Sequence, residues 1–218
     1  DAAKGPWSPT RPRLWAPLEG RPLSVSSADG TPLHAEVFGP EDAPPVVLVH
    51  GWTCALRFWT LQIQELARDF RVIAYDLRGH GSSGMPADRD YSTDAFADDL
   101  DAVLRAALRP GERAVVAGHS LGGMTVVACA ARHPERLRDS IAAAALVATG
   151  MGDLVSESLV LRTPRRLGRV KVAVGRRMLS ASAPLPRRST PISHRAIRYV
   201  TLSRSATPAA VAFCEEIV

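Results

Sequence analysis

Four short apolar runs recur along the first two thirds of the chain, at residues 45–49, 71–75, 113–117 and 142–148. None of them alternates apolar with polar positions, so each predicts a strand that is buried on both faces. Ahead of them, two β-rich stretches within residues 23–38 flank Asp29-Gly30. That dipeptide is typical of a tight hairpin turn.

Apolar positions at helical spacing separate these runs. Residues 59–70 and 96–107 place apolar side chains on one helix face, and residues 121–132 are apolar almost all round. Thr93 is the expected N-cap of the second helix. Strands that alternate with helices predict an α/β fold with a mostly parallel, doubly wound sheet and helices on both faces.

Three regions follow from this pattern. Residues 1–22 are rich in Pro, Arg and Trp without a period, and we interpret them as a poorly ordered N-terminal arm. Residues 23–149 form the predicted α/β core. Residues 150–218 contain helical patterns but no comparable strand, so we expect a helical lid, incomplete at its end.

Composition and charge narrow the classes of partner. The chain has 218 residues, 46% hydrophobic and 22% charged, which is typical of one globular domain. Its net charge is +5; the first 149 residues carry 15 basic and 18 acidic side chains, and the remainder carries 12 and 4. With no nucleic-acid motif present, we interpret the basic part as a solvated face and expect no nucleic-acid partner. Residues 162–188 mix Arg with Val, Leu and Met, which leaves weak contact with a membrane surface as an alternative.

The cysteines and the apolar segments suggest no metal site and no targeting signal. Cys54, Cys129 and Cys214 are widely spaced and form no CxxC or Cys/His cluster, so we expect no zinc and a free buried thiol at Cys129. No signal peptide is evident, and no apolar run reaches the roughly 18 residues needed to span a bilayer. The compartment stays open, with the cytoplasm favoured.

The sharpest chemical signal is Gly118-His119-Ser120-Leu121-Gly122, between a predicted strand and a predicted helix. A G-x-S-x-G sequence in that context predicts a nucleophile elbow, with Ser120 exposed above the sheet in a strained conformation. Gly118 and Gly122 provide the room that such a turn needs. The N–H of Leu121, at the helix N-terminus, is the expected donor to a developing oxyanion.

Two further loops make the chain resemble the serine branch of the α/β hydrolases. His50-Gly51-Trp52 follows one predicted strand, and Asp76-Leu77-Arg78-Gly79-His80-Gly81-Ser82-Ser83, a D-x-R-G-x-G-x-S loop, follows another. The resemblance implies that Trp52 N–H is the second oxyanion donor. It also implies that Asp76, Arg78 and His80 form a hydrogen-bonded scaffold rather than catalytic groups, and that no cofactor is needed.

A serine nucleophile needs a histidine base oriented by a carboxylate, and in this family both follow the serine. After Ser120 only His133 and His194 remain, and neither stands in the expected glycine-flanked context. Asp153, just after the last apolar run, is the candidate acid. The last apolar run reads as an interior strand, and residues 212–218 resemble the middle of a helix. We therefore expect the natural protein to continue through two more strands that bear the acid and the histidine.

These observations predict a serine hydrolase that acts on small carboxylic esters or related acyl substrates through an acyl-enzyme on Ser120. A perhydrolase or a carbon–carbon bond hydrolase would use the same site. A binding protein that keeps the fold but has lost its base is the alternative outside enzymes.

Overall fold

The computed structural model describes residues 14–150 and residue 213. Asp153, His194 and the predicted lid lie outside these residues. The elements share a strand–helix alternation and follow in the order β1 (Arg21–Ser26), β2 (Pro32–Phe38), β3 (Pro45–Val49), η1 (Leu56–Trp59), α2 (Thr60–Leu66), β4 (Arg71–Tyr75), α3 (Thr93–Ala107), β5 (Ala114–His119), α4 (Leu121–Arg132), α5 (Pro134–Asp139) and β6 (Ile141–Val147).

The six strands form one mixed sheet in the order β1-β2-β4-β3-β5-β6. β1 and β2 form the antiparallel hairpin predicted around Gly30, whose φ of 84° suits glycine. β2 is antiparallel to β4, and all pairings from β4 to β6 are parallel. The sheet is not closed, and the predicted α/β architecture is confirmed.

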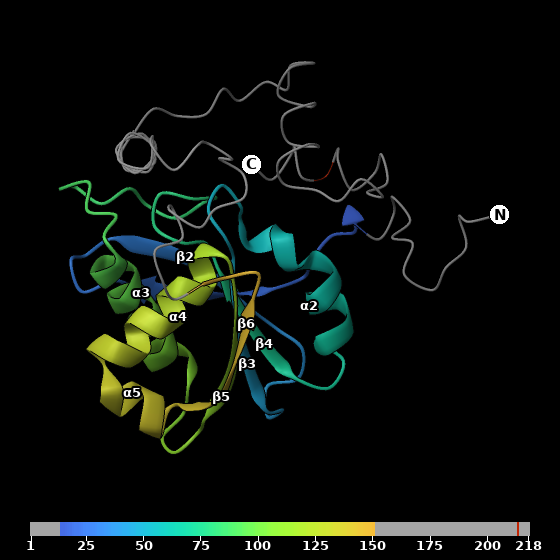
Figure 1. Cartoon of the computed structure of the whole chain (residues 1–218). Helices are drawn as coiled ribbons and strands as arrows, with labels where there is room; N and C mark the ends of the chain where they lie inside the picture. The colour runs from blue at the N-terminus through green and yellow to red at the C-terminus, as the bar shows by residue number, and fades with distance from the viewer. Residues whose placement is uncertain (1–13, 151–212, 214–218) are drawn as a thin grey trace, which may run out of the picture.

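Helices cover both faces of the sheet, as Figure 1 shows, with α2 on one side and α3, α4 and α5 on the other. Alternate residues of the central strands feed two cores. In β3, Val47 and Val49 join the core beneath α3 and α4, whereas Val46 and Leu48 join the core beneath α2. Continuous apolar runs are therefore required in the central strands, because neither face meets water.

Two helix boundaries differ from those predicted. The N-cap of α3 is Ser92, whose hydroxyl accepts a hydrogen bond from Ala95 N–H at 3.2 Å, so the expectation of Thr93 was wrong by one residue. The helix predicted over residues 59–70 is regular only from Thr60 to Leu66 and is preceded by the 3₁₀ turn η1. Phe70 lies beyond the end of α2 but still packs against the core that α2 covers. Its place in the apolar pattern therefore reflects burial, although the residue is not helical.

Among the described residues, no helix combines the length and apolar character needed to cross a bilayer.

Candidate active site

Ser120 is the single residue between β5 and α4, as the elbow motif predicted. Its φ of 51° and ψ of −115° lie outside the regions that side chains favour, at a cost of about 1–3 kcal/mol. The flanking glycines make the turn possible. A Cβ on Gly118 would lie 2.5 Å from the carbonyl oxygen of Gly122, and a Cβ on Gly122 would collide with that of Val49. Any larger residue at either position would break the strand–helix junction.

Four hydrogen bonds hold the backbone of Ser120 in this conformation. Its N–H donates to the Val147 carbonyl in β6 at 3.0 Å. Its own carbonyl accepts from the N–H groups of Gly123 and Met124, at 3.0 and 3.1 Å, and from the Thr149 hydroxyl at 2.7 Å. The strain at Ser120 therefore persists because the surrounding structure over-determines it.

The loop after β3 lies directly against this elbow. A Cβ on Gly51 would be 3.3 Å from Cβ of Ser120. Within residues 14–150, neither Trp52 N–H nor Leu121 N–H donates a hydrogen bond. The Leu121 amide opens α4, where the helix dipole favours negative charge. Two free donors thus border the nucleophile, and the Trp52 side chain beside them is 45% exposed.

His50 is fully buried at the start of this loop, and its hydrogen bonds define its tautomer. Nε2 lies 3.0 Å from the N–H of Leu77, which can only donate, so Nε2 must be the unprotonated acceptor. Nδ1 lies 2.7 Å from the carbonyl of Gly51 and must therefore carry the proton. Burial lowers the pKa of His50 to about 4. The 3.8 Å approach of Nε2 to Asp76 is consequently not an ion pair.

Asp76 ties together the segments around the site. One carboxylate oxygen accepts from Leu56 N–H at 2.5 Å, and the other accepts from Ser82 N–H at 2.9 Å and pairs with His34 Nδ1 at 2.8 Å. The Ser83 hydroxyl donates to the Asp76 carbonyl at 2.6 Å. The carboxylate is fully committed to structure, in agreement with the predicted scaffold role.

Arg78 is buried and fixes the far end of the same loop. Its guanidinium makes a two-point contact with Asp99, at 2.7 and 2.6 Å, and a further bond to Asp29 at 2.9 Å. Burial alone would lower the pKa of Arg78, but the hydrogen bonds and charges of Asp99 and Asp29 raise it. The Nδ1–H of His80 donates to the Arg78 carbonyl at 2.9 Å, so His80 belongs to this scaffold as predicted.

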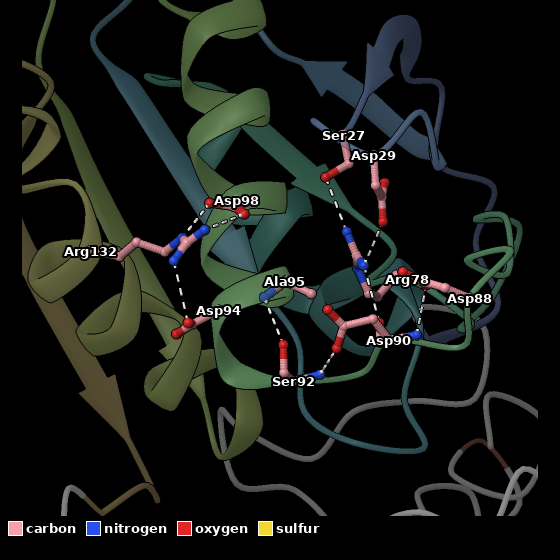
Figure 2. Close-up of a pocket in the computed structure, with 10 residues that line it drawn as sticks. All are labelled: Ser27, Asp29, Arg78, Asp88, Asp90, Ser92, Asp94, Ala95, Asp98 and Arg132. Atoms are coloured by element: carbon pink, nitrogen blue, oxygen red, sulfur yellow. Dashed lines mark hydrogen bonds and ion pairs between the residues drawn. The ribbon is translucent and has the colours of Figure 1, made fainter.

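An acidic pocket of about 280 Å³ lies beside Arg78, away from Ser120. Figure 2 shows Arg78 bonded to Ser27, Asp29 and Asp90, and Arg132 bridging Asp94 and Asp98. The pocket is lined by Ser27, Asp29, Arg78, Asp88, Asp90, Ser92, Asp94, Ala95, Asp98 and Arg132. None of the elbow or oxyanion residues lines it. In the part of the chain that the structure describes, no group of three or more potential ligands could hold a metal ion.

Within residues 14–150, no histidine forms a hydrogen bond with the Ser120 side chain. His119 precedes Ser120 in the chain, and its buried Nδ1 has no hydrogen-bond partner among the described residues. Its ring stacks on Phe58 with centroids 4.6 Å apart. His133 bonds to Asp98 at 2.8 Å behind α4.

His34 forms a carboxylate–histidine pair that sequence reasoning missed. It lies on β2, and its ring contacts both Asp76, at 2.8 Å, and Glu36, at 3.1 Å. Three strand spacings separate β2 from β5, which places His34 roughly 14 Å from the nucleophile. No local pattern in the sequence indicates the pair, because it depends on the register between β2 and β4, which brings residue 34 beside the end of β4.

Residues 44–203 match the family described as the alpha/beta hydrolase fold. The chain belongs to the α/β-hydrolase family. That match covers the elbow, the loop after β3 and the D-x-R-G-x-G-x-S loop, and it extends into residues outside the described ones.

Several curated α/β-hydrolase relatives are enzymes of different kinds. The chain is 37% identical over 124 residues to a bifunctional esterase/perhydrolase of Acinetobacter calcoaceticus, covering 56% of this chain and 43% of the relative. It is 37% identical over 125 residues to a non-heme chloroperoxidase of Streptomyces lividans, covering 56% and 44%. The chain thus spans less than half the length of these relatives.

Solved structures give the same fold. An esterase of Rhodococcus sp. superimposes with a TM-score of 0.55 at 28% identity, over 90% of this chain and 72% of that one. Naproxen esterase of Bacillus subtilis superimposes with a TM-score of 0.63 at 20% identity, over 94% and 63%. At that identity the second likeness speaks to the fold alone.

Proposed function

We propose that the protein is a serine hydrolase that acts on small carboxylic esters through an acyl-enzyme on Ser120. The Ser120 hydroxyl oxygen attacks the ester carbonyl carbon while a base takes its proton. The carbonyl oxygen becomes an oxyanion that accepts hydrogen bonds from Trp52 N–H and Leu121 N–H. Collapse expels the alcohol, which receives the proton from the base, and water then hydrolyses the acyl-enzyme.

The observation that carries this proposal is the arrangement of Ser120 itself. It has a left-handed φ of 51° at the N-terminus of α4, held by four hydrogen bonds, with two amides beside it that no described group engages. Donors fixed in advance around a nucleophile are the feature that stabilises a tetrahedral intermediate. A fold kept only for binding gains nothing from this strain.

The base and its carboxylate are expected outside residues 14–150, because no described histidine forms a hydrogen bond with Ser120 and the family's chain order places both groups after the serine. Asp153 remains the candidate acid. The proposed contact of the basic segment 162–188 with a membrane surface also concerns residues outside the described ones.

A perhydrolase is the second candidate, because one relative is named as both an esterase and a perhydrolase. Hydrogen peroxide would replace water in the second step, attacking the acyl-enzyme carbonyl and releasing a peracid from Ser120. The first step is the same for both activities. The choice between them therefore depends on which small nucleophile reaches the acyl group.

Labelling with a fluorophosphonate tests the proposal, with Ser120→Ala as the control. We expect stoichiometric labelling of the full-length gene product, loss of labelling in Ser120→Ala, and hydrolysis of p-nitrophenyl acetate by the first alone. Adding hydrogen peroxide to a reaction with ethyl acetate then separates the candidates, since a perhydrolase transfers the acetyl group from Ser120 to peroxide and accumulates peracetic acid. A folded wild-type protein that neither labels nor hydrolyses the ester would favour the non-catalytic binding protein.

A further inference from the structure

The peptide between Gly51 and Trp52 carries the N–H that the proposed function uses. Hydrogen bonds to the Gly51 carbonyl determine the orientation of this peptide. A trans peptide is planar, so the Gly51 carbonyl and the Trp52 N–H point in opposite directions. The Gly51 oxygen accepts from His50 Nδ1–H at 2.7 Å and from Cys54 N–H at 3.2 Å. Whatever fixes this oxygen therefore fixes the direction of the Trp52 N–H.

The His50 ring is itself held from its other nitrogen. Leu77 N–H donates to Nε2 at 3.0 Å, which keeps the proton on Nδ1, facing Gly51. The ring also packs edge-on against His80, with centroids 5.5 Å apart. Because His50 is fully buried, water does not compete for either nitrogen.

Gly51 lies within contact distance of the elbow, so a small rotation of this peptide changes what Ser120 meets. A Cβ on Gly51 would be 3.3 Å from Cβ of Ser120 and 2.8 Å from Nδ1 of His119. The peptide is clamped between the elbow on one side and the His50 ring on the other. Loss of the shorter hydrogen bond leaves only the turn bond from Cys54.

From this geometry we propose that His50 is a positioning residue, which aims the Trp52 N–H at the oxyanion by holding the Gly51 carbonyl through Nδ1–H. The inference rests on the proposed function, since it concerns the donor used there. His50 touches no reacting atom. The Leu77 N–H contributes by selecting the tautomer that can donate.

Two substitutions separate this role from simple loop tethering. The side-chain amide of asparagine can place an N–H where Nδ1 stands, so His50→Asn can keep the bond to Gly51 and lose the acceptor for Leu77. Glutamine can place an oxygen where Nε2 stands, so His50→Gln can keep the bond to Leu77 and lose the one to Gly51. Each variant gives up one buried hydrogen bond, so their melting temperatures should fall by similar amounts.

The measurement is steady-state hydrolysis of p-nitrophenyl acetate by the full-length gene product and both variants. We expect His50→Gln to lower kcat by about 10- to 100-fold with KM within about two-fold, and His50→Asn to keep kcat within about three-fold. Equal losses in both variants, no loss in either, or a larger loss in His50→Asn would overturn the inference. An inactive wild-type protein would instead remove the proposed function, and this inference with it.

Discussion

The centre of the sheet and its β5–β6 flank are built from similar apolar runs but differ sharply in burial. Every residue of β3 and β4 is buried, whereas in β6 only Ile141 is. Val115, Leu146 and Val147 are 40%, 42% and 46% exposed. The difference teaches that an apolar run specifies a strand suited to burial, while burial itself depends on neighbours on each face and edge.

Ser120 lies where these two regions meet. On the side facing β3, the loop that contains Gly51 lies against Ser120. On the exposed flank, the backbone of Ser120 forms hydrogen bonds with Val147 and Thr149. The backbone of the proposed nucleophile is therefore held by a buried core on one side and by a solvent-exposed flank on the other.

Acid should lower the free energy of unfolding through His50, which is buried in the central region. Burial lowers the pKa of His50 to about 4, below the roughly 6.5 expected when unfolded, so the folded state binds fewer protons. The stabilisation is complete above pH 6.5 and is lost as the pH falls toward 4. At about 1.4 kcal/mol per unit this amounts to roughly 3 kcal/mol.

Denaturant unfolding at several pH values measures this loss, and His50→Asn is the control because it lacks the titrating group. Burial also lowers the pKa of His80 and His119, so a shallower slope of the same sign should remain in the variant. An unchanged slope would mean that His50 does not carry the effect.

Removing the same two methyl groups should have unequal effects in the two regions. Val47→Ala, at a fully buried position of β3, should lower the free energy of unfolding by about 2–3 kcal/mol. Val147→Ala, at a position 46% exposed, should change it by less than about 0.5 kcal/mol. Urea unfolding of both variants tests the contrast, and comparable losses would show that the flank is covered in solution.

A smaller loss of stability than that of Val47→Ala is expected when the hydrogen bond between the flank and the nucleophile is removed. Thr149→Val removes the 2.7 Å hydrogen bond to the Ser120 carbonyl and should cost about 1 kcal/mol. Under the proposed function it should also slow fluorophosphonate labelling. Thr60→Val is the matched control. The Thr60 hydroxyl, at the start of α2, donates to the Arg57 carbonyl at 2.7 Å, so this variant should alter stability without altering labelling. Equal labelling by both variants would show that the elbow does not need the flank.

Local patterns predicted the parts of the structure that local physics determines. The hairpin at Gly30, the strands, the bounds of α4 and the elbow follow from turn chemistry, apolar runs and the glycines of the motif. The pairing of His34 with Asp76 could not be read in the same way, because it depends on the register between β2 and β4. The tautomer of His50 depends on Leu77, 27 residues away.

The amide hydrogen of Ser120 offers a view of how β6 moves. It is bonded to Val147, near the end of β6, so it can exchange with solvent only when that contact opens. Its exchange rate would therefore report how often the C-terminal end of β6 opens, at the residue where chemistry is proposed. A slow rate would make the serine's strained backbone a permanent feature, and a fast rate would make it one that is repeatedly lost and re-formed.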